Sequence, residues 1–288
     1  MSHGDKPNYG SQPNAATEPY SDDVLAKLRI DAAEVVGRYP QKRSALLPLL
    51  HLVQSVDGYV STRGIEFCAE TVELTAAEVS GVATFYTQYK RHPNGDYTIG
   101  VCTNTLCAVM GGDAIWDAVS EHLAIGHDET TPDGRITLER IECNAGCDYA
   151  PVVMANWEFF DNQTPESVIR TVDALREGKV ISPTRGAATV ATFKEVSRVL
   201  AGFHDGRAVE GDTGGPATVR GLRHAKEKGW HAPAATSAGE SSGLTTTTYP
   251  SSAETGQRSA RSTGSQDTPS NAPGEKPGAS GNVGKANR

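Results

Sequence analysis

The sequence has no segment that would carry it into or across a membrane. No run of about 20 apolar residues occurs in it, although a transmembrane helix needs roughly that length. Residues 1–19 contain neither the apolar core of a signal peptide nor an Arg-rich amphipathic pattern, so no export or organelle targeting is expected. We therefore predict a cytoplasmic protein without direct membrane insertion, in which cysteine thiols stay reduced.

Nucleotide-binding signatures and a basic central region are also missing. Neither a Gly-x-Gly-x-x-Gly fingerprint nor a Walker loop occurs. Residues 95–180 carry 5 basic and 15 acidic side chains, a net charge of −10, and this balance argues against binding to nucleic acid. An acidic segment suits a protein partner with a complementary surface, or it serves solubility alone.

Large apolar side chains are scarce at both ends of the chain. From residue 231 to residue 288 the only sizeable ones are Leu244, Tyr249 and Val283. Such stretches cannot bury enough apolar surface to offset the entropy lost on ordering. We predict a disordered N-terminus over residues 1–19 and a disordered C-terminal tail over residues 231–288.

The apolar spacing of residues 20–92 is typical of a small helical bundle. Four helices are expected, and start or stop signals mark all but the third. The first follows Ser21 and ends at Tyr39-Pro40, the second follows Ser44 and ends at Asp57-Gly58, the third runs through Ile65 and Cys68, and the fourth opens with the capping box Thr75–Glu78 and reaches Tyr86.

From residue 93 to residue 180 the pattern changes to α/β. We expect strands at 97–101, 135–142 and 151–154, one helix from about Cys107 to Leu123, and a last helix from Thr164-Pro165-Glu166 to Gly178. The order β, α, β, β, α predicts a compact α/β sandwich, in which a small sheet packs on helices. Residues 181–230 are predicted to form a partly ordered extension with helices near 193–203 and 221–230.

Four of the five cysteines form two pairs, Cys102-x4-Cys107 and Cys143-x3-Cys147. Each pair follows an extended apolar run and belongs to a Gly-containing loop, so two loops can bring the pairs together. Four converging thiolates can hold a [2Fe–2S] cluster, in which each iron takes two cysteine sulfurs, or a structural zinc ion. The same pairs could also form two disulfides, or no bond at all. The spacing alone leaves iron–sulfur and zinc both open.

The placement of the pairs favours a redox-capable metal site. Cys102 ends a predicted strand and Cys107 begins a predicted helix, whose N-terminal dipole favours the thiolate. The loop between them offers backbone N–H groups that can bond to cluster sulfurs, and Gly146 allows close approach of the backbone in the second pair. The candidate metal-ligating and cofactor-binding residues are therefore Cys102, Cys107, Cys143 and Cys147.

Three motifs together resemble a known family. They are Gly81-Val-Ala-Thr-Phe-Tyr86, Cys102-Thr-Asn-Thr-Leu-Cys107 followed by Gly111, and Glu142-Cys-Asn-Ala-Gly-Cys147 followed by Ala150-Pro151. All occur in the family's order. Over about residues 20–180, the chain resembles the thioredoxin-like ferredoxin subunit (the E subunit) of bacterial NADH:quinone oxidoreductase, respiratory complex I.

This resemblance implies an α/β protein: an N-terminal helical bundle at 20–92, then a thioredoxin-like [2Fe–2S] ferredoxin domain at 93–180. It implies one [2Fe–2S] cluster on the four paired cysteines and no catalytic residue in this chain. The implied partners are the flavoprotein subunit, which binds FMN and NADH, and the large iron–sulfur subunit of complex I. The implied place is peripheral, on the cytoplasmic side of the plasma membrane. The equivalent diaphorase subunit of an NAD-linked hydrogenase or formate dehydrogenase, and a structural zinc module, are the competing interpretations.

The chain departs from the family pattern in two loops. Leu106 stands where the family commonly has proline, and Asn144-Ala145-Gly146 replaces the usual Leu-Gly-Ala. Both cysteine spacings survive, so we expect ligation to persist. Beyond residue 180, the segments Pro183-Thr-Arg-Gly-Ala and 221–233 resemble the extension of actinobacterial members of the family.

The remaining candidates receive structural interpretations. Cys68, on a helix among apolar neighbours, is predicted to be a buried structural thiol. Phe85, Tyr86 and Tyr89 are predicted to pack in the core rather than to touch the flavoprotein partner. The histidines at 51, 92, 122 and 127 lack ligand-like spacing and are predicted to be structural or exposed.

Overall fold

The computed structural model describes residues 18–231. Residues 18–230 belong to one compact unit. The predictions of disorder over 1–19 and 231–288 concern residues that, apart from 18, 19 and 231, lie outside the described part of the chain. Within the described part of the chain, no helix is both long and apolar enough to cross a membrane.

The first part of the chain forms the expected helices, which build one hydrophobic core. They are α1 (Asp22–Val36), α2 (Leu46–Asp57), α3 (Thr62–Val72) and α4 (Ala76–Phe85), with a short 3-10 turn at Lys42–Ala45. Thr75 and Glu78 form the predicted capping box, and α2 stops at Gly58, whose φ is 80°. Leu49, Leu50, Leu52 and Val53 of α2 are fully buried, each worth about 1.5–3 kcal/mol of hydrophobic stabilisation.

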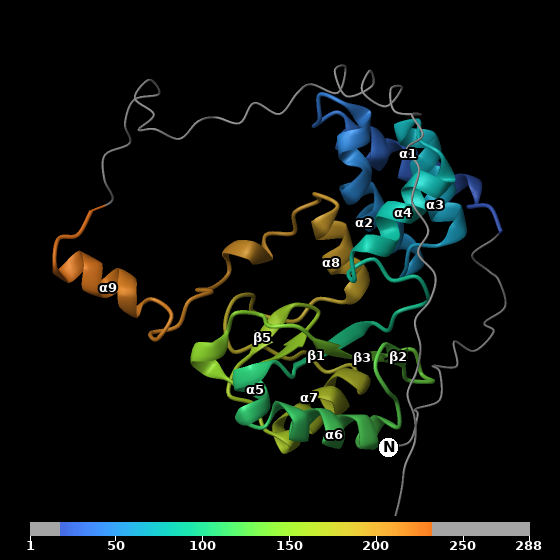
Figure 1. Cartoon of the computed structure of the whole chain (residues 1–288). Coiled ribbons are helices and arrows are strands. Elements are labelled where there is room, and N and C mark those ends of the chain that lie inside the picture. Colours follow the sequence, from blue (N-terminus) through green and yellow to red (C-terminus); the bar gives the residue numbers. More distant parts are fainter. Residues whose placement is uncertain (1–17, 232–288) are drawn as a thin grey trace, which may run out of the picture. The chain divides into compact units, whose positions relative to one another are not determined.

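A helix from the C-terminal extension packs against this bundle. α8 (Phe193–Leu200) lies along α2 (Figure 1), and Ala201 belongs to the bundle core. Gln54 Nε2 of α2 donates a hydrogen bond of 3.2 Å to Ser197 Oγ of α8. The predicted helix near 193–203 is therefore confirmed, and its amphipathic face explains why it packs here.

His51 of α2 gives the bundle a pH-dependent weak point. Its ring lies 4.7 Å from the Tyr89 ring, its Nδ1 is buried without a hydrogen-bond partner, and burial lowers the pKa of His51 from 6.5 to about 4. In the unfolded chain His51 thus binds a proton near pH 6.5, whereas in the folded chain it binds one only near pH 4. The stability that this neutral ring permits is complete above pH 6.5 and is lost as the pH falls toward 4.

We expect the lowered pKa of His51 to reduce the free energy of unfolding by about 2 kcal/mol between pH 7 and pH 5. This corresponds to a fall of about 4–8 °C in the thermal midpoint, followed by far-ultraviolet circular dichroism. In His51→Gln the acid-induced fall should be smaller by that amount. His122→Gln is the matched control, since His122 is a half-exposed histidine on the sheet-covering helix Gly112–Leu123. An equal pH slope for wild type and His51→Gln would contradict the prediction.

The second part of the described chain is a mixed five-stranded sheet with strand order β2-β3-β1-β4-β5. β1 (Tyr97–Cys102) pairs in parallel with β3 (Ile136–Ile141), and the other pairs, which involve β2 (Glu129–Thr130), β4 (Val153–Ala155) and β5 (Glu158–Phe160), are antiparallel. α6 (Gly112–Leu123) and α7 (Pro165–Arg176) lie side by side on one face of the sheet (Figure 1). Apolar side chains from both layers form its core, among them Ile99, Val101, Leu138, Ile115, Val119 and Val172.

Two predictions about this sheet region were wrong. The single helix from Cys107 to Leu123 is two helices, α5 (Thr105–Val109) and α6, because Gly111 between them adopts φ 113°, where glycine is favoured. The hairpin of β4 and β5 was missed, because its turn is Asn156-Trp157, with φ of 45° and 70°. Asn-Gly is the usual sequence signal for a tight turn of this kind. Here tryptophan stands in the place of glycine, so the sequence carries no such signal.

The rest of the extension contains little regular structure. A 3-10 turn spans Arg207–Val209, and the last described helix is α9 (Arg220–Glu227). The helix predicted at 221–230 is thus present but shorter. Another 3-10 turn, Cys147–Tyr149, belongs to the loop of the second cysteine pair.

Candidate metal centre

The fold brings the two cysteine pairs to one edge of the sheet. Cys102 is the last residue of β1 and pairs with Ile141, the last residue of β3. Because the two strands are parallel neighbours, the chain segments that leave them start side by side. α5 carries Cys107 and the loop after β3 carries Cys143 and Cys147.

The sulfur atoms of the second pair have a spacing that suits one metal atom. Cys143 Sγ and Cys147 Sγ lie 3.9 Å apart, and two thiolates bound tetrahedrally at about 2.3 Å would lie roughly 3.8 Å apart. The thiol of Cys107 interacts electrostatically with those of Cys102 and Cys147, and Cys147 interacts in the same way with Cys102. All five cysteines are free, so the disulfide interpretation is not supported.

The donor set at this edge of the sheet is four thiols in two pairs. Within residues 18–231, no group of three or more His, Cys, Asp or Glu side chains is preformed around one metal position. Two pairs of thiols can supply two thiolates to each of two metal atoms, as in a [2Fe–2S] cluster. A four-cysteine zinc site would need all four sulfurs around one point.

Burial disfavours the thiolate form of Cys107. Cys102 and Cys107 are 2% and 3% exposed, and they pack with Ala150 and Val152. Burial first, and then the neighbouring thiols of Cys102 and Cys147, raise the pKa of Cys107 to about 11. The position of Cys107 in the short helix α5 does not overcome this. Metal binding must therefore displace the proton of the Cys107 thiol, which makes it pH-dependent.

Short links hold the two loops together. Asn104 caps α5 by accepting from the Thr105 N–H, and its Nδ2 donates a hydrogen bond of 3.0 Å to Glu142 Oε2 in the other loop.

The Ala145 N–H donates to Cys143 Sγ at 3.3 Å, the kind of bond that tunes the potential of a cluster. A side chain at Gly112 would place its Cβ 2.5 Å from the Cys102 carbonyl oxygen, so only glycine fits there.

The outer side of the site is open and apolar. Cys143 and Cys147 are exposed, and around the first pair Leu106, Val109 and Met110 are 44%, 79% and 55% exposed. Large exposed apolar side chains gathered near a cofactor site are typical of a surface that binds a partner.

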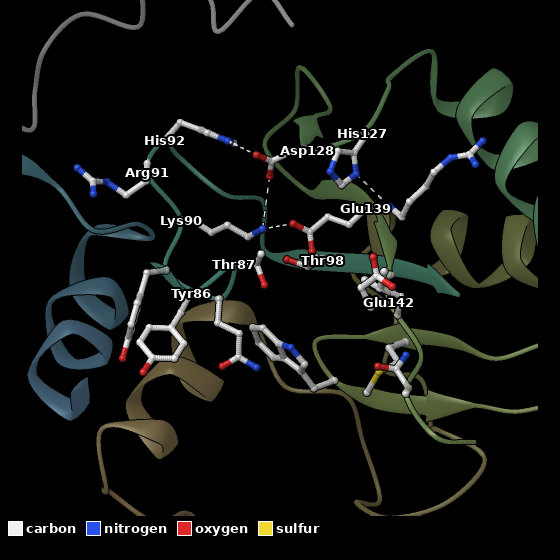
Figure 2. A pocket seen from close by; sticks show the side chains of 18 of the residues that line it. Tyr86, Thr87, Lys90, Arg91, His92, Thr98, His127, Asp128, Glu139 and Glu142 are labelled. Atoms are coloured by element: carbon white, nitrogen blue, oxygen red, sulfur yellow. Dashed lines mark hydrogen bonds and ion pairs between the residues drawn. The ribbon is translucent and has the colours of Figure 1, made fainter. Parts of the chain in front are cut away.

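A cavity of about 1020 Å³ extends from the second cysteine loop to the end of α4. Its walls include Cys143 and Asn144 at one end and Thr84 and Tyr86 at the other. Lys90 is one of the residues that line it, and Figure 2 shows its side chain directed toward Asp128 and Glu139. Lys90 is 5% exposed. Sequence reasoning missed this ion-pair network, because no motif marks its members.

The aromatic and cysteine predictions made outside the pairs had mixed outcomes. Tyr89 is buried, as predicted, but Phe85 and Tyr86 are 78% and 44% exposed, so their placement in the core was wrong. They lie at the end of α4, where the chain leaves the bundle. Cys68 is fully buried in the bundle core, which confirms the structural interpretation, and burial raises its pKa strongly.

Comparison with known proteins shows to which family the chain belongs. The model of the thioredoxin-like [2Fe-2S] ferredoxin family matches residues 32–176, which include both cysteine pairs. The chain belongs to that family. The sheet, its two covering helices and the preceding helices are accordingly the fold predicted for a thioredoxin-like ferredoxin with an N-terminal bundle, and the match to a [2Fe-2S] ferredoxin family supports an iron–sulfur cluster in this domain.

Three relatives of this ferredoxin illustrate the settings in which the family occurs. The E subunit of NADH-quinone oxidoreductase from Mycobacterium tuberculosis is 59% identical over 219 residues, which cover 76% of this chain and 86% of the relative. NADH-quinone oxidoreductase subunit 2 of Thermus thermophilus is 37% identical over 51% of this chain and 82% of its own. A subunit of the NADP-reducing hydrogenase of Solidesulfovibrio fructosivorans is 38% identical over 48% and 81%. Close relatives are thus subunits of an oxidoreductase.

Proposed function

We propose that this chain is the electron-transfer ferredoxin subunit of NADH:quinone oxidoreductase, and that Cys102, Cys107, Cys143 and Cys147 hold one [2Fe–2S] cluster. The observation that carries the proposal is the meeting of two cysteine pairs at the ends of two parallel strands. The high identity to the mycobacterial NADH-quinone oxidoreductase relative over most of the chain supports the setting. When bound, such a cluster supplies a site that accepts and returns single electrons.

The surrounding residues suit an exchange of electrons with a protein partner. Cys102 and Cys107 are buried on the sheet side, while Cys143 and Cys147 face outward, so electrons have a short way to the surface through the second pair. The exposed apolar side chains of Leu106 and Val109 provide contact area beside that route. The net charge of −10 over residues 95–180 favours a partner with a complementary basic surface.

The chain has no nucleotide-binding motif of its own, so NADH oxidation falls to a partner. We propose that this partner is the flavoprotein subunit of complex I, which would bind NADH and FMN, and that the cluster exchanges one electron with the FMN. The large iron–sulfur subunit of complex I is the second proposed partner. The complex would hold the chain on the cytoplasmic side of the plasma membrane, without inserting it.

One relative supports a second candidate function, that of a hydrogenase subunit. The hydrogenase subunit of Solidesulfovibrio fructosivorans is 38% identical over 48% of this chain, which makes a diaphorase subunit of an NAD-linked hydrogenase the second candidate. The greater identity and coverage of the mycobacterial relative favours complex I. Co-purification of this chain with membrane-bound, quinone-dependent NADH oxidation, rather than with hydrogen-dependent NAD reduction, separates the two.

The purified chain should contain about two irons and two acid-labile sulfides and show a rhombic electron paramagnetic resonance signal after reduction with dithionite. Metal analysis and spectroscopy of the same sample test this directly. One zinc per chain without any such signal would show that the site is a structural zinc module.

A further inference from the structure

The C-terminal extension touches the loop of the second cysteine pair through two segments, residues 184–186 and 211–218. Both lie outside the part of the chain that the family model matches, which ends at residue 176. The first segment binds Phe159 and Asp161 and lies beside Gly146, and the second binds Asp148 and Tyr149, which follow Cys147. We call these two segments the clamp.

Arg185 is the centre of the clamp. Its Nε and Nη2 lie 3.0 and 3.2 Å from the two carboxylate oxygens of Asp161, and its Nη1 donates a hydrogen bond of 3.0 Å to the Thr213 carbonyl. The side chains of Arg185 and Asp161 are only 13% and 9% exposed. The hydrogen bond from Nη2, the ion-pair contact of Nε and the low exposure of both side chains restrict the orientation of the guanidinium.

The guanidinium also lies directly against the cysteine loop. It stacks over the Phe159 ring at 3.9 Å from the ring centroid. A Cβ built on Gly146 would lie 3.1 Å from Arg185 Nη2, so the guanidinium occupies the space beside Gly146 that a side chain there would need. Gly146 directly precedes Cys147. Arg185 therefore supports the loop at the residue before a proposed ligand.

The second segment of the clamp holds the residues that follow Cys147. The Ala217 N–H donates to Tyr149 Oη at 3.1 Å, and Thr218 Oγ1 donates to the Asp148 carboxylate. Gly215 leaves the room that the Tyr149 hydroxyl occupies, because a Cβ there would lie 2.2 Å from that oxygen. The two segments are joined, since the Gly186 N–H donates to the Asp212 carbonyl at 3.1 Å.

We propose that the clamp is a built-in support for the cluster, and that Arg185 is a positioning residue whose charge, balanced by Asp161, adjusts the reduction potential. This inference rests on the proposed [2Fe–2S] cluster. Reduction by one electron makes such a centre more negative, so a nearby cation favours the reduced form and a nearby anion opposes it. In the native chain the ion pair largely cancels, and each partner alone acts with its own sign.

The test uses the full-length, cluster-loaded chain and four variants: Arg185→Met, Arg185→Lys, Asp161→Asn and Arg185→Met/Asp161→Asn. Midpoint potentials come from redox titration followed by electron paramagnetic resonance. Loss of visible absorbance in the presence of an iron chelator measures how firmly the loop is held. Arg176→Met is the matched control, because Arg176 pairs with Asp133 at 2.8 Å on the same domain but is more exposed.

Arg185→Met leaves the Asp161 carboxylate unpaired, so its potential should shift downward, whereas Asp161→Asn leaves the cation unpaired and should shift the potential upward. The double variant should return close to the native potential. Arg185→Met and the double variant should lose the cluster about 10- to 100-fold faster, as expected when a residue that orients a metal ligand is removed. Arg185→Lys keeps the positive charge but lacks the planar guanidinium group, so it should lose the cluster faster at a nearly native potential. Arg176→Met should change neither quantity.

Shifts of the same sign in Arg185→Met and Asp161→Asn, or no shift in either, would overturn the electrostatic role of Arg185. Chelator resistance that is unchanged in every variant would overturn the clamp. In both cases a two-iron signal in the native chain leaves the proposed function intact. A native chain without that signal would remove the proposed function and this inference together. If Arg185→Met does not fold, Arg185→Lys and Asp161→Asn decide the matter.

Discussion

Substitution of Cys107 by alanine is expected to abolish the cluster, so that the purified chain loses its visible absorbance and falls from about two irons to well below one. Cys107 is 3% exposed and packs with Ala150 and Val152, neither of which can supply a side-chain ligand. An iron that loses one of its two thiolates in such a place has no spare donor beside it to complete its coordination. Iron and sulfide analysis, together with the signal of the dithionite-reduced sample, measures the loss.

Cys68→Ala is the matched control, because Cys68 is also a buried free thiol. It lies in the bundle core and not in the cysteine loops, and burial raises its pKa, which keeps it protonated. We expect an unchanged cluster and a loss of about 1 kcal/mol for the emptied volume, or about 2–4 °C in the thermal midpoint. A native spectrum in Cys107→Ala would refute the ligand assignment, and loss of the spectrum in Cys68→Ala would give Cys68 a role that its position does not suggest.

The elements that frame the centre were predictable because their signals are local. A capping box at Thr75–Glu78 and a capping threonine before Pro165 each satisfy free backbone groups within four residues. The alternation of apolar residues before Cys102 and Cys143 marks two strands, and consecutive strands joined through a helix are commonly parallel neighbours. From that arrangement alone, the two cysteine loops are expected at one edge of the sheet.

Other features depend on contacts between distant residues, and no local pattern reveals them. The helix spacing around Phe85 and Tyr86 is that of a core stripe, yet α4 ends at Phe85 and the chain turns away, so both rings are exposed. Asn156-Trp157 forms a tight turn because the strands on either side pair with each other. Arg185 and Gly146 are 39 positions apart in the chain, and their contact exists only because the extension returns to the cysteine loop.

Lys90 is the strongest example of such a contact, because a lone lysine in a polar loop has no predictive pattern. Its backbone N–H donates to Gln54 Oε1 of α2 at 2.9 Å, while its Nζ binds Glu139 of β3 and Asp128 beside β2. One residue thus ties the bundle to the sheet. Its ammonium is nearly completely buried, and Glu139 is 18% exposed, so the pair is shielded from water.

Removal of this cation should be among the most destabilising single changes in the described chain. Lys90→Met leaves Glu139 charged and largely buried without its cation, which costs about 3 kcal/mol, or about 6–12 °C in the thermal midpoint. Lys90→Met/Glu139→Gln should recover most of that loss, because the unpaired charge is gone. Arg176→Met breaks a half-exposed pair with Asp133 and should cost at most about 1 kcal/mol. If Lys90→Met is no worse than Arg176→Met, or the double variant is worse than Lys90→Met, the buried pair does not join the two parts as its geometry indicates.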